Sequence, residues 1–95
     1  AYFAGVTPNP IVGDIKAQTA QVLRRVDALL KLAGTDKSRL LRAQVWIADM
    51  RLFEDHNAAW NEWVDPVNPP ARACLTSHFW RPGMLVEVIV VAAVP

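Results

Sequence analysis

The segment that most constrains the fold is the apolar stretch at residues 85–94, which a single acidic residue, Glu87, interrupts. It is rich in valine and has the composition of a β-strand. Apolar side chains fall on both faces of this predicted strand: Leu85, Ile89 and Val91 on one, and Val86, Val88 and Val90 on the other. A strand of this kind needs cover on both sides. Because two helices can cover only one face of a small sheet, the second apolar face predicts a homo-oligomer.

Length and charge limit the remaining possibilities. The chain has 95 residues, 53% of them hydrophobic and 20% charged, so it is predicted to form one domain, residues 1–95, with one core. A formal net charge of +1 gives no strong attraction to nucleic acid or to an anionic membrane. The one cysteine, Cys74, excludes an intrachain disulfide, and no Cys/His cluster has the spacing of a metal site. No apolar run reaches the ~20 residues of a spanning helix and no targeting segment is visible, so we expect a cytoplasmic protein.

The most regular pattern predicts a helix over residues 15–33, with Asp14 as its N-terminal cap and Gly34 at its C-terminal end. Its inner face is formed by residues at spacings of three and four: Ile15, Thr19, Val22, Val26, Leu29, Leu30 and Ala33. Its outer face is predicted to carry Lys16, Gln18, Gln21, Arg24, Arg25 and Lys31. This segment is therefore expected to pack along one side of a sheet.

Further elements follow from β-prone runs and helix breakers. Residues 2–6 and 40–48 are predicted strands, and a second helix is predicted over residues 50–64 behind the cap Asp49. Three prolines in residues 65–70 end that helix. The last third is predicted to be a hairpin, in which strands at residues 71–80 and 85–94 are joined by a turn at residues 81–83.

Arg72 is the first candidate for a functional side chain. It follows the rigid Asn-Pro-Pro-Ala segment at residues 68–71 and has small neighbours on its strand, so its guanidinium has space around it. A guanidinium held in this way can bind a carboxylate or phosphate through two parallel hydrogen bonds. The alternative is an exposed edge-strand arginine or a structural ion pair.

Glu87 is the second candidate, because an ionised group in an apolar strand is costly unless it is paired or hydrated. In the predicted hairpin it would lie diagonal to Cys74 and within reach of Arg72. It could then position or deprotonate a water beside a bound anion. The alternative is an ion pair with Arg72 that only holds the sheet together.

Other polar residues are assigned structural roles. Asn57 lies on the predicted inner stripe of the second helix with Phe53, Trp60 and Val64, and we expect its amide to bond to neighbouring backbone. Cys74 has no evident base partner and is predicted to be a small buried side chain. His56 and His78 are too isolated to indicate a metal site, and His56 is predicted to lie on the helix surface.

Together these residues resemble the Rid family, the YjgF-like reactive enamine/imine deaminases. The resemblance is carried by the run Asn-Pro-Pro-Ala-Arg-Ala-Cys at residues 68–74 and by Leu-Val-Glu-Val at residues 85–88, with a similar interval between the arginine and the glutamate. The opening residues 2–5, the helix with its Ala33-Gly34 end, and Asn57 align in the same order. The resemblance covers nearly the whole chain. Members usually have a further N-terminal strand, which is missing here and is expected to precede Ala1 in the native protein.

The resemblance implies an α+β fold similar to that of bacterial chorismate mutase. A mixed sheet would be backed by two helices and assembled as a homotrimer with ligand sites in clefts between subunits. It also implies hydrolysis of 2-aminoacrylate-like enamines, through their imines, to 2-keto acids and ammonia, without a cofactor or metal. By matching position, Arg72 would clamp the substrate carboxylate, Glu87 would position water, and the backbone at Cys74 and around Gly5 would contact the substrate.

Two departures bear on this expectation. Ala4 stands where deaminating members commonly carry a hydroxyl residue, and the Thr-Ser-His-Phe-Trp segment at residues 76–80 differs from the usual continuation after the cysteine. Three alternatives therefore stay open. They are a non-catalytic module that binds small carboxylates, an RNA-directed or translation-inhibiting activity, and a reaction on a cyclic or aromatic-pathway imine.

Overall fold

The computed structural model describes residues 1–95, and its longest element is helix α1, Ile15–Leu32. The Asp14 carboxylate caps the helix by accepting a hydrogen bond of 2.9 Å from the Ala17 N–H. Gly34 follows the helix with a φ of +77°, a conformation that glycine adopts without strain. Both predicted ends of the helix are therefore confirmed.

The centre of the fold is a strand–helix–strand unit. Strand β1, Leu40–Ile47, leads through a 3-10 turn at Met50–Leu52 into helix α2, Phe53–Trp63, and strand β2, Ala71–Thr76, follows. The Asp49 carboxylate caps the turn by accepting a hydrogen bond of 2.8 Å from the Arg51 N–H. The strand at residues 40–48 and the helix behind Asp49 are thus confirmed to within a few residues.

The sheet contradicts the predicted hairpin. Strand β3, Val86–Ala92, pairs with β1 in antiparallel fashion, and β2 pairs with the other edge of β1 in parallel, so that the strand order is β2-β1-β3. The segment at residues 81–83 is a loop that does not join paired strands. A helix between two strands is the usual connection of a parallel pair, and the two strands that flank α2 do pair in this way.

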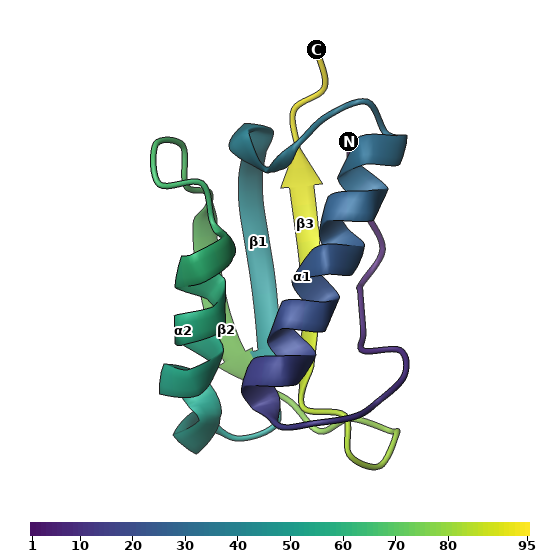
Figure 1. The fold of residues 1–95 in the computed structure, drawn as a ribbon, viewed down its shortest axis with the longest axis vertical. Helices are drawn as coiled ribbons and strands as arrows, with labels where there is room; N and C mark the ends of the chain where they lie inside the picture. Colours follow the sequence, from purple (N-terminus) through teal and green to yellow (C-terminus); the bar gives the residue numbers. More distant parts are fainter.

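Both helices lie on the same side of this sheet, with β1 between the two outer strands (Figure 1). The core between helices and sheet includes Val22, Val26 and Leu30 of α1, Trp60 of α2, Val45 and Ile47 of β1, and Val86, Val88 and Val90 of β3. The N-terminal segment runs along the outer edge of β3 through two isolated bridges, Tyr2 with Val91 and Val6 with Val88, rather than as the predicted strand. The free edge of the sheet is therefore β2.

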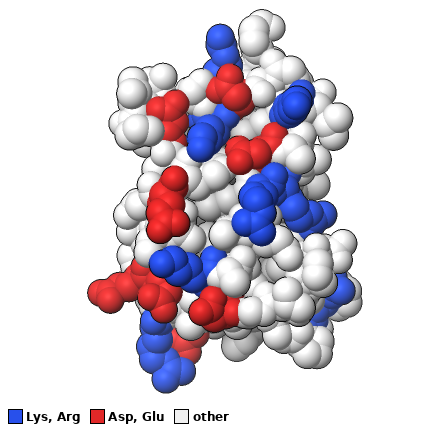
Figure 2. Space-filling view, in the orientation of Figure 1, with Lys and Arg blue, Asp and Glu red and all other residues white.

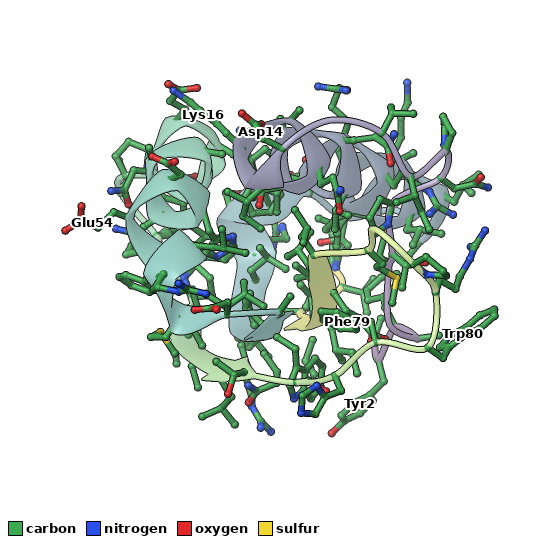
Figure 3. The ribbon with its side chains drawn as sticks, turned by 90° about the horizontal axis from the view of Figure 1, so that it is seen from below. Tyr2, Asp14, Lys16, Glu54, Phe79 and Trp80 are labelled. Atoms are coloured by element: carbon green, nitrogen blue, oxygen red, sulfur yellow. The ribbon has the colours of Figure 1, made fainter.

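The side of the sheet opposite the helices stays uncovered within the chain; we call it the open face. Tyr2 extends from this side, away from both helices (Figure 3). Tyr2 and Leu75 are 88% and 55% exposed, and Trp46 beside them is half-buried. The prediction that one apolar face of the sheet lacks cover within the chain is confirmed.

Two side chains lie in places that the sequence pattern did not indicate. Gln18 is buried because its amide Nε2 donates to the carbonyls of Gly13 and Gly83 at 3.0 and 2.8 Å, while its Oε1 accepts from the Leu85 N–H at 2.9 Å. His56 is fully buried because α2 packs against α1 as well as the sheet, and its Nδ1 lies 3.0 Å from the Thr19 hydroxyl. The predicted surface positions of both residues were wrong.

Candidate functional site

The guanidinium of Arg72 lies between two aromatic rings of α2. Arg72 shares the helix-facing side of the sheet with its register partner Ala43, which is buried. Its Cζ is 5.0 Å from the ring centroid of Trp60 and 5.7 Å from that of Phe53. The single ion pair of the chain is Asp49–Arg51, so no carboxylate neutralises Arg72. The predicted alternative of an internal ion pair is therefore wrong.

Arg72 also has unused hydrogen-bonding capacity. Its Nη1 is buried and has no acceptor, and burial lowers the pKa of the guanidinium from its usual value. Buried polar atoms without partners are uncommon in folded proteins, and each such atom calls for an explanation. A cation that is partly desolvated and has a free N–H is suited to an anionic ligand.

Asn57 lies on the helix face that carries the two rings beside this arginine. It is four residues after Phe53 and three before Trp60, so it belongs to the same stripe of α2 as the two rings that flank the guanidinium. Its Oδ1 is buried without a hydrogen-bond partner. The stripe is as predicted, but the expected hydrogen bond from neighbouring backbone to this oxygen is not formed.

Cys74 lies two residues beyond Arg72 on the same side of β2 and packs against the core. It is half-buried and free, and burial raises the pKa of its thiol despite the opposing effect of the Arg72 charge. A thiol in this setting is a poor nucleophile, because only the thiolate attacks. The assignment of Cys74 as a small, packed side chain fits this geometry.

Glu87 lies on the open face, beside Gly5 of the N-terminal segment. Its register partner on β1 is Trp46. A Cβ atom added to Gly5 would come within 2.1 Å of the Glu87 Oε2, far closer than real contacts allow. Gly5 is therefore required for the close approach of this carboxylate, and the structure brings together the two residues that the sequence analysis named separately.

The candidate residues consequently form two groups on opposite sides of one sheet. Arg72, Cys74 and Asn57 lie on the helix side near the free edge, whereas Glu87 and Gly5 lie on the open face near the other edge. The predicted diagonal contact between Glu87 and Cys74 was wrong, because β1 separates β2 from β3. No single ligand of a few atoms can touch both groups in the same chain, since two strand spacings amount to roughly 10 Å.

The open face contains the largest hollow of the chain, with a volume of about 310 Å³. It is lined in part by Trp46, which is the cross-strand partner of Glu87, and by Ile89, which lies two residues after Glu87 on β3. The remaining lining residues are Tyr2, Arg42, Gln44 and Val91. Two neighbours of Glu87 thus line a concave, mainly apolar surface, while Glu87 itself is not among the lining residues.

Of the two departures from the family pattern, one adjoins Gly5 and the other lies mostly in the loop that follows β2. Ala4 precedes Gly5 in the exposed N-terminal segment. Phe79 and Trp80 belong to the loop between β2 and β3, which lies at the end of the sheet that faces the viewer in Figure 3. Trp80 is 85% exposed and stacks against the Arg81 guanidinium at 5.4 Å. Neither ring contacts Arg72 in its own chain.

The structure contains neither a metal-binding cluster nor a membrane-spanning helix. No group of three or more His, Cys, Asp or Glu side chains is placed to bind a metal ion. Neither helix combines the length with the apolar composition needed to cross a bilayer.

The sequence pattern indicated neither the aromatic contacts of Arg72 nor the position of Trp46 beside Glu87. Phe53 and Trp60 were assigned to the core stripe of α2, and the strand at residues 71–80 was predicted, but not its packing against these two rings. One available signal was the strand–helix–strand order of residues 40–76, which favours parallel pairing and places β2 beside β1.

Comparison with known proteins adds independent information. The sequence profile of the family described as "Endoribonuclease L-PSP" matches residues 1–94. A "RutC family protein" of Haemophilus ducreyi is 43% identical over 94 residues, which are 99% of this chain and 80% of that protein.

Two solved structures have the same fold. One is a protein of unknown function of the conserved Rid protein family, YyfA from Yersinia pestis, with a TM-score of 0.90 and 30% identity over 98% of this chain and 79% of that one. The other is a putative translation initiation inhibitor from Salmonella typhimurium, with a TM-score of 0.90 and 34% identity over 95% of this chain and 78% of that one.

Proposed function

Because the chain belongs to the endoribonuclease L-PSP family, which includes RutC and Rid proteins, we propose that it hydrolyses reactive imines of 2-keto acids. Its substrates would be 2-aminoacrylate-like enamines in their imine form, and its products a 2-keto acid and ammonia. The family membership is established, and the reaction is our proposal.

The observation that carries the proposal is the state of Arg72. Its guanidinium is partly buried, has no carboxylate partner and keeps a buried N–H without an acceptor. A 2-imino acid has a carboxylate next to its reactive carbon, so a forked hydrogen bond from Arg72 would fix that carbon in position. The backbone at Cys74, two residues along the edge strand, would contact the bound acid.

The chemistry needs only water and a carboxylate. Water adds to the imine carbon as the C–N double bond becomes single, and Glu87 would accept the proton of that water. Return of this proton to the nitrogen would give a carbinolamine. Glu87 would then take the hydroxyl proton of the carbinolamine and pass it to the amino group as the C–N bond breaks and the C=O bond forms, which releases ammonia and the keto acid. Gly5 would leave room for Glu87 to hold this water.

Since Arg72 and Glu87 lie on opposite sides of one sheet, a site that uses both must combine two copies of the chain. We propose a homotrimer in which the free β2 edge and Arg72 of one copy meet the Glu87 side of the next. The exposed apolar side chains Tyr2 and Leu75 would become buried in this assembly. The cleft between copies would then be the active site.

The primary test measures keto-acid release from enzymatically generated 2-aminoacrylate. Arg72→Ala should lower the rate roughly a hundredfold or more, because the substrate carboxylate loses its charged partner. Arg72→Lys should recover only part of the rate, since the ammonium lacks the fork. Full activity in Arg72→Ala, with the assembly intact, would remove the proposed clamp.

A second test asks whether the site is shared between copies. Arg72→Ala and Glu87→Gln chains are unfolded together, refolded as a mixture and assayed. If a cleft takes Arg72 from one copy and Glu87 from its neighbour, roughly a quarter of clefts should regain both groups in random trimers. If each site lies within one copy, the mixture stays as inactive as its components.

The same assays address the other functions open to this family. Binding of 2-oxobutanoate without turnover of any imine would favour a non-catalytic carboxylate-binding module. Activity on RNA is suggested by the family description, and inhibition of translation by the description of the Salmonella relative. On the helix face, however, acidic and basic side chains are interspersed and form no basic stripe (Figure 2). RNA cleavage by the wild type that Arg72→Ala leaves unchanged would favour that alternative.

A further inference from the structure

The aromatic rings beside Arg72 have a role beyond filling the core. Phe53 and Trp60 are seven residues apart on α2, which places them two turns apart on one stripe. The Arg72 Cζ lies 5.7 Å from one ring centroid and 5.0 Å from the other. The guanidinium is therefore flanked along the helix by both rings, with Asn57 between them.

No other described group compensates the positive charge of Arg72. No carboxylate pairs with it, and the nearby His56 directs its Nδ1 to the Thr19 hydroxyl. The face of an aromatic ring carries partial negative charge and attracts a cation, most strongly where water is excluded. The two rings consequently offset part of the free-energy cost of removing the guanidinium from water.

A ring holds a guanidinium differently from a carboxylate. A carboxylate would occupy the N–H groups that a substrate needs, whereas a ring interacts with the cation and leaves these donors free. On the basis of the proposed function, we propose that Trp60 and Phe53 are positioning residues, which keep the guanidinium of Arg72 in place and its donors available for the substrate carboxylate. They act through Arg72 and do not touch the reacting carbon.

This role makes a specific kinetic prediction. Loss of a ring should weaken binding of the carboxylate, because the guanidinium must then be ordered when the ligand arrives. It should leave the addition of water to the imine largely unchanged. The effect should therefore appear in the KM of the imine and in the Kd of a keto acid, with little change in kcat.

The experiment compares Trp60→Leu with Trp60→Phe, Phe53→Leu and a matched control, Trp63→Leu. Trp63 packs against Trp60 at 5.5 Å between ring centroids but contacts Lys37 and Asp27 instead of Arg72. For each assembled variant, calorimetry gives the Kd of 2-oxobutanoate and steady-state kinetics gives KM and kcat. Thermal unfolding reports how much stability each substitution removes.

Trp60→Leu is expected to raise both Kd and KM roughly tenfold, while Trp60→Phe restores most of the affinity because it keeps a ring. Phe53→Leu should have a smaller effect of the same kind, and Trp63→Leu should bind like the wild type. Equal affinities in the two tryptophan-to-leucine variants would overturn the inference, as would a Trp60→Phe variant as weak as Trp60→Leu. Should Trp60→Leu not fold, Phe53→Leu at its half-buried position gives the same comparison.

The outcomes separate this inference from the proposed function. If Arg72→Ala loses 2-oxobutanoate binding while the ring variants keep it, only the positioning role is wrong. If Arg72→Ala binds 2-oxobutanoate as tightly as the wild type, the carboxylate clamp and the positioning role both fail.

Discussion

Protonation of His56 should destabilise the folded chain at mildly acidic pH. This side chain is fully buried between the two helices, with the Thr19 hydroxyl at its Nδ1 and no hydrogen-bond partner for its Nε2. Burial and, to a smaller extent, the positive charge of Arg72 together lower the pKa of His56 from 6.5 to about 4. The folded chain therefore keeps a neutral imidazole at a pH where the unfolded chain is protonated.

The sign and size of the effect follow from proton linkage. Between its folded and unfolded pKa values the unfolded chain binds more protons, so stability falls as the pH falls through this window. The contribution of His56 is complete above its unfolded pKa of 6.5 and is lost progressively toward about pH 4. Since one pKa unit corresponds to about 1.4 kcal/mol, the loss amounts to roughly 3 kcal/mol.

The measurement is urea denaturation at a fixed protein concentration between about pH 4 and pH 7.5, because assembly would make stability depend on concentration. His56→Gln keeps a polar group of similar size that does not titrate, so its free energy of unfolding should change little over this range. The control is His78→Gln, which alters the only other histidine, an exposed one, and should retain the full slope.

Asp49 affects the stability over a lower pH range than His56 does. The pKa of Asp49 is lowered from 3.8 to about 2, chiefly by hydrogen bonds from Arg51, so its contribution is lost as the pH falls from about 4 toward about 2. The same pH slope in the wild type and in His56→Gln would refute the reasoning. An NMR titration of the folded protein that gave His56 an ordinary pKa would refute it equally.

Three further substitutions test local features of the fold and the site. Gly5→Ala should lower kcat for imine hydrolysis roughly a hundredfold with little change in Tm, because the new methyl group displaces the Glu87 carboxylate; unchanged kinetics would show that this carboxylate does not act on water. Gln18→Leu should lower the free energy of unfolding by about 3 kcal/mol in urea, since two carbonyls and one N–H lose their buried partner, and a loss below about 1 kcal/mol would contradict that view. Asp14→Ala should cost about 1 kcal/mol in the same assay while Asp14→Asn retains most of the stability, and equal losses in both variants would argue against capping.

The elements that the sequence predicted correctly are those set by nearby residues. Helix α1 has its cap at Asp14 and its apolar stripe within a few turns, and β1 is a compact β-prone run. The mispredicted features depend on residues far apart in the chain. Gln18 is buried by segments 65 and 67 residues away, and His56 by a helix 37 residues earlier. The pattern of neighbouring residues in the sequence does not predict such long-range contacts.

The candidate site likewise has features that nearby residues predict and features that depend on residues far apart in the chain. The sequence alone identified Arg72 as a cation with space around it and Glu87 as an acid in an apolar strand, because both depart from their immediate surroundings. The predicted hairpin that would have joined them was wrong. The composition of residues 81–83 indicates a turn but does not determine whether the strands on either side of it pair with each other. Strand pairing is decided by the whole sheet, and here β1 takes the central position.

The sequence by itself determined the kinds of element, the ends of α1 and the presence of an apolar strand face that the chain cannot cover. These follow from side-chain chemistry at spacings of a few residues. Only the tertiary structure decided which strands pair, which side of the sheet each candidate side chain occupies, and that Arg72 is held between Phe53 and Trp60. Side-chain direction alternates along a strand, so the side is known only once the register and the position of the helices are fixed.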